Sequence, residues 1–540
     1  MNLLKKTLTV GLLAAALPGM ASAQTILHIS GSTAFRSPVD AAIVNYLNSS
    51  NTPNKAKAAW SGSNVIKNNI GIYADGSVTF SGSTFTGTAK TIILTNWTGS
   101  LAGVVDLVAQ NSSLLFLDPA NATVETALNG DTITVTGTAI TDTGTSVSTT
   151  GTTKAAATDV AMSDSFQSSV ASALSSAALT GQPGTVTVSP QTGAGLSSLV
   201  KNAPLAEAGS ASPIVGGGTG AGYLGIVPFE WVLGNITGTG NETAIPFTNI
   251  TLQTADFLIN KGFAPFTMFS AFNTASTAND PTKFVYLVGR NEDSGTRIDA
   301  FAEPLLGFIA NPQQYRLAFT GGSNTANVPA PTDYTQIGGS GGLVTGMQAW
   351  PSNATLNTEP SINWSAAGGG HGGYAAGGDV ASVLGTVVSQ GPLGTNGSGF
   401  AGENSGNTYF IGYLGISDAG NFVIPASTVP GGSNSPSGVV GGTSLSYNGV
   451  PYSSAAVLSG AYSFWSYEHM YYLASGGNKI AADRQGVADS LANSIASTFA
   501  AYNSSGNPGQ ANAAGIILPV TNAAGSVTRS VEGGNFSLNY

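Results

Sequence analysis

The sequence predicts an α/β protein, because a short apolar strand, a small polar turn and a helix follow one another three times along the chain. The three strands are expected at Thr25 to Ser30, Ile92 to Leu94 and Val285 to Val288. This order is typical of α/β domains with a mostly parallel sheet. The 540 residues exceed what one compact core holds, so we expect two or three domains.

Each strand leads into a helix with a recognisable beginning. Ser37 is expected to cap the first helix, with Pro38 at its first position, and Ser100 is expected to cap the second. Apolar residues then recur at spacings of three and four in the helices: Val39, Ile43, Tyr46 and Leu47; Leu101, Val104, Val105 and Val108; and Ile298, Phe301 and Leu305.

The segments between these units have their own patterns. Asp75 to Lys90 and Asp131 to Thr153 alternate small polar and apolar residues, which predicts β-hairpin insertions. The glycine-rich segments 216–222, 368–378 and 431–442 are expected to be loops. A long helix is predicted near the end of the chain, where apolar residues recur every three or four positions at Val487, Leu491, Ile495, Phe499 and Tyr502.

Composition excludes several classes of protein. The absence of cysteine excludes disulfide scaffolds, iron–sulfur clusters, thiolate zinc sites and cysteine nucleophiles. The three histidines, His28, His371 and His469, are far apart, and neither an Asp/His metal cluster nor a Gly-x-Ser-x-Gly turn with a partner histidine is evident. We therefore expect no enzyme, no metal and no cofactor. A formal net charge of −10 argues against nucleic acids and anionic membrane surfaces as partners.

The first 23 residues have the pattern of a secretory signal peptide. Lys5 and Lys6 precede an apolar stretch from Leu8 to Met20, and Ala21-Ser22-Ala23 supplies small residues at the cleavage site. The apolar stretch is shorter than the ~20 residues that a bilayer requires. We expect cleavage after Ala23, export to the periplasm or the cell exterior, and no membrane span in the mature chain.

Four segments place small hydroxyl residues where a strand passes into a helix. A helix N-terminus has unpaired N–H groups and a partial positive charge, and glycine lets an oxyanion approach closely. Several such ends converging on one point would bind an anion, although each alone is more often an ordinary helix cap. The segments are Ser30-Gly31-Ser32-Thr33-Ala34-Phe35, Gly99-Ser100-Leu101-Ala102-Gly103, Met162-Ser163-Asp164 and Arg290-Asn291-Glu292-Asp293-Ser294-Gly295-Thr296.

In this order the segments resemble the phosphate-binding proteins of bacterial ABC importers, members of the type II periplasmic-binding-protein superfamily. Only the turn from Arg290 to Thr296 is distinctive by itself. Ile337 to Gly342 and Ile411-Gly412-Tyr413 resemble segments of the family's second lobe, and Tyr223 to Gly234 resembles its first interlobe crossing. The resemblance spans about residues 25 to 475, interrupted by insertions.

The resemblance implies a two-lobed fold of mixed sheets flanked by helices. Lobe I would comprise residues 24–230 and 455–540, and lobe II residues 231–454, with crossings near Ile226 to Gly234 and near Pro451 to Tyr462. It further implies a monomer that binds inorganic phosphate or a similar oxyanion and works with an ABC permease. The ligand-binding residues that it implies are Ser32, Thr33, Phe35, Ser100, Asp164, Arg290, Ser294, Gly295 and Thr296, with Glu292 holding Arg290.

Asp164 has the most informative implied role. A carboxylate only accepts hydrogen bonds, so it requires a proton on the ligand; phosphate and arsenate carry one and sulfate does not. The alternative for Asp164 is the N-cap of a helix that contains Phe166 and Val170.

The chain departs from the family pattern at several positions. Asp293 stands where the family usually has glycine, Glu292 replaces an aspartate, and Ala34 stands where threonine is expected. Ser61-Gly62-Ser63 offers another register for the second turn. The departures favour one alternative function, a secreted or surface structural protein on the same scaffold without a transport role.

One further segment allows more than one interpretation. The aromatic segment from Phe464 to Tyr472 could be a stacking platform, but we expect it to be lobe core. We place His469 in a helix there, packed rather than catalytic.

Overall fold

The computed structural model describes residues 24–50, 56–81, 84–136, 139–175, 193–209, 223–234, 247–269, 284–307, 314–320, 343–349, 373–374, 377–385, 408–416, 418–419, 442–504, 527–529, 531–534 and 537–538. The following lie outside the described residues: the expected signal peptide, the segment Ile337 to Gly342, His371, the loop 216–222, the loop 431–442 apart from its last residue, and most of the loop 368–378.

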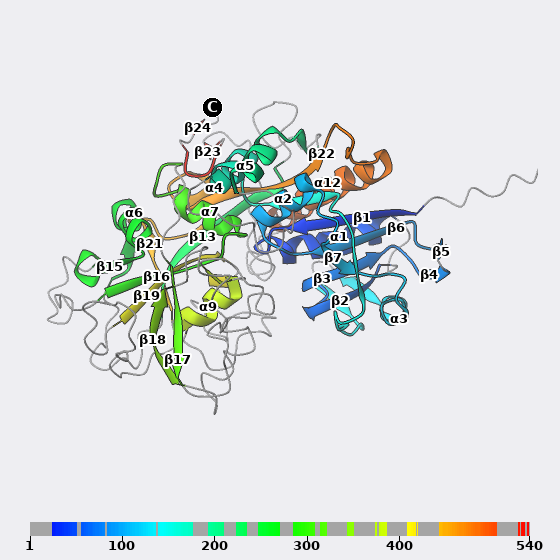
Figure 1. Cartoon of the computed structure of the whole chain (residues 1–540), viewed down its shortest axis with the longest axis horizontal. Helices are drawn as coiled ribbons and strands as arrows, with labels where there is room; N and C mark the ends of the chain where they lie inside the picture. The colour runs from blue at the N-terminus through cyan, green and yellow to red at the C-terminus, as the bar shows by residue number, and fades with distance from the viewer. Residues whose placement is uncertain are drawn as a thin grey trace, which may run out of the picture.

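One large mixed sheet runs through the molecule (Figure 1). Its main strands are β1 (Thr25–Gly31), β2 (Lys57–Asn64), β3 (Lys67–Ala74), β6 (Thr91–Asn96), β11 (Val160–Ser163), β13 (Gly225–Leu233), β15 (Phe263–Pro265), β16 (Phe284–Val288), β19 (Thr408–Gly415) and β22 (Trp465–Leu473). They lie in the order β15-β16-β19-β13-β22-β11-β1-β6-β3-β2. Two short strands are added, β12 (Leu205–Glu207) beside β22 and β20 (Thr443–Ser444) beside β13.

The ladders of this sheet are of both kinds. Strand β1 runs parallel to β6 and β11, and β16 runs parallel to β19. The other described ladders are antiparallel, including β2–β3, β3–β6, β11–β22 and β13–β22. The expected α/β class, with mixed sheets flanked by helices, is confirmed. The expectation of a mostly parallel sheet is wrong, because a hairpin and the crossing strands add antiparallel neighbours.

We call β1, β2, β3, β6 and β11 the first half of the sheet. Two helix layers cover it: α1 with α12 on one face, and α2, α4 and α5 on the other (Figure 1). Apolar residues at spacings of three and four seat α1, α2 and α12, as expected from the sequence; the side chains of Phe499 and Tyr502 in α12 lie outside the described residues. Their bounds are α1 (Arg36–Ser50), α2 (Ser100–Ala109), α4 (Gln167–Ser175), α5 (Gly193–Asn202) and α12 (Ala482–Ser504).

Two predicted helix caps are wrong. Helix α1 begins at Arg36, so Ser37 and Pro38 both lie in its first turn. Ser37 is therefore not the residue before the helix, and Pro38 is not its first residue. The N-cap of α2 is Gly99, and Ser100 is the first helical residue. The hydroxyl of Ser100 is therefore available for a contact outside its own helix.

We call β15, β16 and β19 the second half of the sheet. Helices α6 (Leu252–Lys261), α7 (Gly295–Ala302) and α9 (Gly377–Gly385) pack against these strands. Helix α7 ends at Ala302, so Leu305 lies beyond it rather than on its apolar face as predicted. The remaining elements beside this half are η1 (Phe266–Met268), β14 (Asn249–Ile250), β21 (Ser446–Tyr447) and α11 (Ser454–Leu458).

Strands β13 and β22 join the two halves (Figure 1). They pair antiparallel from Gly225↔Glu468 to Pro228↔Trp465. Beyond this stretch β22 pairs with β11 of the first half, and β13 pairs with β19 of the second. The aromatic segment that contains His469 is thus the strand β22, not a helix. Its residues are buried throughout, as expected of core.

Small hairpins are inserted between the elements of the large sheet. The expected insertions at 75–90 and 131–153 contain the antiparallel pairs β4–β5 and β8–β9. Among the helices that the structure describes, none combines the length and apolar character of a bilayer span. The remaining bounds are β4 (Val78–Ser81), β5 (Thr84–Gly87), β7 (Leu115–Leu117), α3 (Ala122–Gly130), β8 (Ile133–Thr136), β9 (Ala139–Asp142), β10 (Thr153–Ala155), β17 (Tyr315–Thr320), β18 (Leu343–Ala349), β23 (Val527–Thr528) and β24 (Ser537–Leu538).

Candidate functional site

Three of the predicted turns meet because β6, β1 and β11 are adjacent and parallel, so their carboxyl ends lie at one edge of the sheet. The N–H of Ser32 donates to the carbonyl of Met162 at 2.9 Å, and the N–H of Gly99 donates to the carbonyl of Gly31 at 2.8 Å. The N–H of Asp164 donates to the Ser100 hydroxyl at 3.4 Å. In open α/β sheets this edge is where ligands bind.

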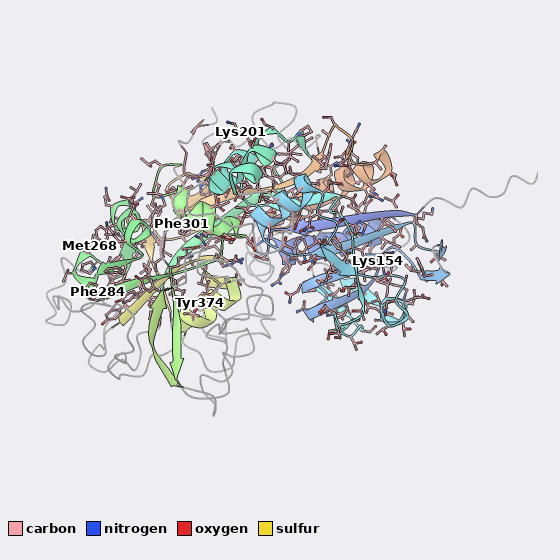
Figure 2. All side chains as sticks on the ribbon, viewed as in Figure 1. Lys154, Lys201, Met268, Phe284, Phe301 and Tyr374 are labelled. Atoms are coloured by element: carbon pink, nitrogen blue, oxygen red, sulfur yellow. The ribbon has the colours of Figure 1, made fainter. Side chains whose placement is uncertain are left out.

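The fourth turn, from Arg290 to Thr296, comes from the second half. Its backbone N–H at Arg290 donates to the Tyr413 hydroxyl at 3.0 Å, and the Arg290 Nε donates to the carbonyl of Tyr374 at 3.2 Å. The Gln314 amide donates to the Arg290 carbonyl at 2.8 Å. Arg290 is only 2% exposed, so these bonds fix a buried cation in place. Figure 2 labels Tyr374 in this half of the molecule.

The fourth turn contacts the other three directly. The Arg290 Nη2 donates to the Thr33 hydroxyl at 3.2 Å. The N–H of Leu101, in the first turn of α2, donates to the carbonyl of Asp293 at 3.0 Å. The Thr296 hydroxyl donates to Asp164 Oδ2 at 3.5 Å. The two halves of the molecule therefore meet at the residues that the sequence singles out.

Gly295 is required at this contact. A Cβ added there would lie 1.6 Å from Asp164 Oδ1 and 2.7 Å from the Ser100 Cβ. Any larger residue would hold the two halves apart, because the interior is close-packed and Asp164 is 1% exposed. Gly99 is constrained in a similar way: its φ of 111° and the carbonyl of Asp293, 2.3 Å from an added Cβ, both demand glycine.

Asp164 is electrostatically unusual. Burial raises its pKa to about 6, the Ser100 hydroxyl and the Arg290 charge oppose this increase, and the Glu532 charge adds to it. Its Oδ1 has no hydrogen-bond partner among the described residues. The predicted alternative, an N-cap role for Asp164, is not seen in its hydrogen bonds. The N–H of Phe166, just before α4, donates to Glu532 at 2.6 Å instead.

Helix α7 presents its N-terminus to the same place. The Ser294 hydroxyl is the cap, accepting from the N–H of Arg297 at 3.4 Å. The N–H groups of Gly295 and Thr296 donate to no residue in the described part of the chain. These two amides, the Thr296 hydroxyl and the helix dipole form a donor set that suits an oxyanion.

Other predicted residues have different surroundings. Phe35 is buried in the main core, and the Ser32 hydroxyl accepts the N–H of Phe35 at 3.3 Å. Burial lowers the pKa of Arg297, and the charges of the buried Glu292 and of Asp293 oppose this decrease. The pairing of Glu292 with Arg290 stays a prediction. Ser61, in the alternative register, lies in β2 opposite Ile70.

The sequence analysis missed several buried charges beside the site. They lie inside apolar strands and helices, and in a chain with 8% charged residues that context could have indicated them. No group of three or more such side chains is arranged to hold a metal ion in the described ranges. The residues are Arg297 and Asp299 on α7, Glu468 on β22, and Arg529 and Glu532 near the end of the chain.

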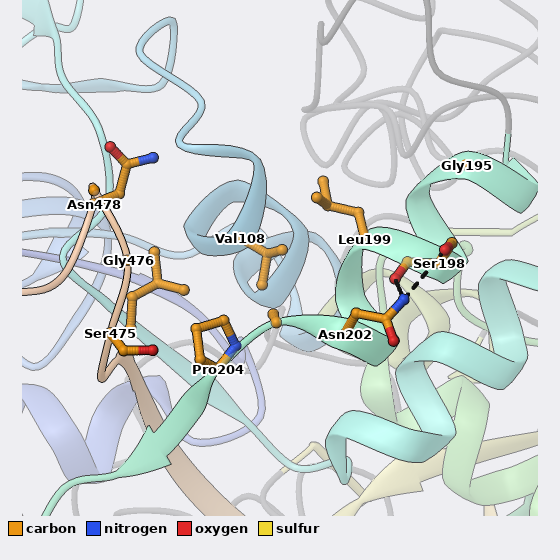
Figure 3. A pocket seen from close by; sticks show the side chains of 12 residues that line it. Val108, Gly195, Ser198, Leu199, Asn202, Pro204, Ser475, Gly476 and Asn478 are labelled. Atoms are coloured by element: carbon orange, nitrogen blue, oxygen red, sulfur yellow. Dashed lines mark hydrogen bonds between the residues drawn. The ribbon is translucent and has the colours of Figure 1, made fainter.

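A separate hollow of about 510 Å³ lies between the end of α2, helix α5 and the loop after β22 (Figure 3). It is lined by uncharged residues, which include Val108, Leu199, Pro204 and Gly476. The Asn202 amide there is bonded to the carbonyl of Ser198 at 2.7 Å. None of the predicted site residues lines this hollow.

Comparison with known proteins gives only distant likenesses. No family model matches the chain, and no curated protein matches it. An ABC-type phosphate transport receptor from Vibrio cholerae aligns with 9% identity over 87% of this chain and 95% of its own, at a TM-score of 0.32. A protein provisionally assigned as a phosphate ABC transporter substrate-binding protein, from Clostridium perfringens with bound phosphate, aligns with 12% identity, 87% and 93% coverage and a TM-score of 0.30.

A possible phosphate-binding protein from Planctomyces limnophilus aligns with 9% identity over 92% of this chain and 94% of its own, at a TM-score of 0.29. TM-scores this low mark a loose superposition, so these likenesses carry no argument about a ligand. The case for a ligand rests on the contacts of the four turns.

Proposed function

We propose that this chain is an exported solute-binding protein that captures phosphate, or a related tetrahedral oxyanion, between its two halves. The observation that carries the proposal is the meeting of Ser100, Asp164, Arg290, Gly295 and Thr296 from both halves at one buried point. Hydroxyl groups, free amides and one arginine supply donors there without any basic surface. An acidic protein can therefore hold an anion, because distant carboxylates are screened over about 10 Å.

Asp164 gives the site its selectivity in this proposal. Above its pKa of about 6 the side chain is a carboxylate, which accepts but does not donate. A phosphate or arsenate that carries a proton donates to it, whereas sulfate leaves two unprotonated oxygens facing each other in a buried site. Such a mismatch costs about 1–3 kcal/mol or more.

The wider assignments belong to the same proposal. We infer a periplasmic or extracellular location after removal of residues 1–23, a monomer, and an ABC permease as the partner in uptake. Lobe I (24–230 and 455–540) and lobe II (231–454) would close over the ligand. The crossings near Ile226 to Gly234 and near Pro451 to Tyr462 stay predictions; the strands that link the two halves of the sheet are β13 and β22. Hinge closure around a ligand is a common two-state motion of such lobes.

One observation favours a second function. The carbonyl of Asp293 already occupies N–H groups at the start of α2, and Gly295 packs directly on Asp164. A scaffold whose halves meet without a ligand would suit a secreted or surface structural protein with no transport role. Binding and structural roles make opposite predictions for the effect of phosphate on stability.

The test is thermal unfolding of the purified mature chain with increasing phosphate. A binder gains about 2.7 kcal/mol at a hundredfold excess of ligand over its dissociation constant, so the midpoint should rise with phosphate. Arg290→Gln should abolish the rise. Arg36→Gln, which removes a half-buried arginine that donates to the Asn69 side chain, should keep it.

If Arg290→Gln does not fold, Thr33→Val, which removes the acceptor for Arg290 Nη2, replaces it and should reduce the rise. An unchanged midpoint in millimolar phosphate would favour the structural role.

A further inference from the structure

Glu468 is a buried acid that the anion site does not yet explain. It lies on β22 where this strand pairs with β13, opposite Gly225, and it is 0% exposed. Its backbone carbonyl accepts the N–H of Leu224 at 2.8 Å. Neither of its side-chain oxygens has a hydrogen-bond partner among the described residues. A buried carboxylate without partners is unfavourable, so a role for this group is expected.

Glu468 lies beside the anion site. In the antiparallel β11–β22 ladder Ser163 pairs with His469, so Asp164 and Glu468 are the next residues along it. The Ser466 hydroxyl on the same strand donates to the Asp164 carbonyl at 2.6 Å. Burial raises the pKa of Glu468, the charge of Asp164 raises it further, and the nearby Ser32 hydroxyl partly offsets the increase. Asp299 approaches from α7, and both of its carboxylate oxygens lack partners in the described ranges. Glu468 is thus faced by Asp164 at the end of β11 and by Asp299.

The other charges of this region act through Asp164 and Asp299. For Asp299, burial raises the pKa most, the Asp164, Glu532 and Glu468 charges add to this, and the Arg529 charge opposes it. Arg290 lowers the pKa of Asp164. His469, the next residue on β22, pairs with Glu207 at 3.0 Å. Burial raises the pKa of Glu532, and the hydrogen bond from the Ser169 hydroxyl opposes this increase. Acids therefore outnumber cations around Glu468.

A bound oxyanion would add negative charge to this group of acids. Carboxyl groups that close to one another and to an anion cannot all remain ionised. A protonated carboxyl group can instead donate a hydrogen bond to a ligand oxygen, or accept one from a protonated ligand if it is ionised. In both arrangements one proton lies between the carboxyl group and the ligand.

We propose, resting on the proposed function, that Glu468 makes anion capture proton-coupled: the ligand enters the site together with one additional proton, held between the Glu468 carboxyl group and a ligand oxygen. The site then favours the more protonated form of the oxyanion, and affinity falls as pH rises. Glu468→Gln keeps the size and neutrality of the protonated side chain at every pH, so it should remove this part of the pH dependence.

The experiment is calorimetric titration of phosphate into the wild type and Glu468→Gln between pH 5.5 and 8.5. Both proteins meet the same mixture of phosphate forms, so the titration of the ligand itself cancels. At pH 5.5 we expect the wild type and Glu468→Gln to bind phosphate with equal affinity. At pH 8.5 we expect the variant to bind about tenfold more tightly, which corresponds to a change of one unit in the pKa of Glu468 on binding. Repeating the titration in buffers of different ionisation enthalpy should show proton uptake by the wild type and less by the variant.

The control is Glu230→Gln, another buried glutamate on a crossing strand, whose carboxylate is bonded to Ser444 at 2.8 Å. It should show the wild-type pH profile. Parallel profiles for the wild type and Glu468→Gln would overturn the inference while leaving phosphate binding intact. If the variant does not fold, zero uptake or net release of protons by the wild type would overturn it. No phosphate binding by the wild type at any pH would overturn the proposed function and this inference with it.

Discussion

Substituting Gly295 by alanine tests the contact between the halves most sharply. The added Cβ would lie 1.6 Å from Asp164 Oδ1 and 2.7 Å from the Ser100 Cβ, and neither neighbour can move cheaply because both residues are about 1% exposed. Overpacking of this kind costs about 1–3 kcal/mol. Since the clash exists only when the halves are together, the cost should appear as phosphate binding weakened by about 5- to 150-fold.

The assay is calorimetric titration with phosphate, accompanied by thermal unfolding without ligand. Gly486→Ala in α12 is the matched control, because a Cβ there meets nothing within 4 Å. The control should bind phosphate as the wild type does and should be unchanged or stabilised by about 0.4–1 kcal/mol. Wild-type phosphate affinity in Gly295→Ala would refute the argument that closure brings this turn onto Asp164.

Two further outcomes are expected. Burial raises the pKa of Asp106 to about 8, so its contribution to folding stability is present at acid pH and is lost as pH rises between about 4 and 8. Urea unfolding should therefore show a lower free energy of unfolding at pH 8 than at pH 5, by at most about 4 kcal/mol from this group. Asp106→Asn should flatten this pH profile. Tyr413→Phe removes the hydroxyl that accepts from the Arg290 N–H and donates to Gln314 at 2.7 Å. Phosphate binding should weaken by about 1–3 kcal/mol, while the far-ultraviolet circular dichroism spectrum stays unchanged. Wild-type phosphate affinity in this variant would contradict the positioning role of Tyr413.

Much of the fold could be predicted because its units are local in sequence. The strands at Thr25, Ile92 and Val285 and the helices that follow them carry clear apolar spacings and glycine turns. The turns of the first half meet because β6, β1 and β11 are adjacent and parallel, an arrangement that alternating strands and helices favour. The hairpin insertions follow from alternation of small polar and apolar residues.

The rest depends on tertiary packing that local patterns do not encode. Strand β22 is buried on both faces, so it lacks the alternation that separates a strand from a helix. For this reason the sequence around His469 predicts a helix where the structure has a strand. The docking of Asp293 on α2 joins residues almost two hundred positions apart. The roles of Glu468 and Asp299 depend on the same long-range approach, which no spacing within either segment indicates.

The most direct test of the central claim is a titration of phosphate and of sulfate into the wild type and Asp164→Asn at pH 7.5, where the wild-type side chain is ionised. The Asn side chain can donate as well as accept. We predict that the wild type binds phosphate and rejects sulfate, and that the variant admits sulfate, which reduces the difference in affinity between the two anions. Equal binding of the two anions by the wild type would contradict this prediction.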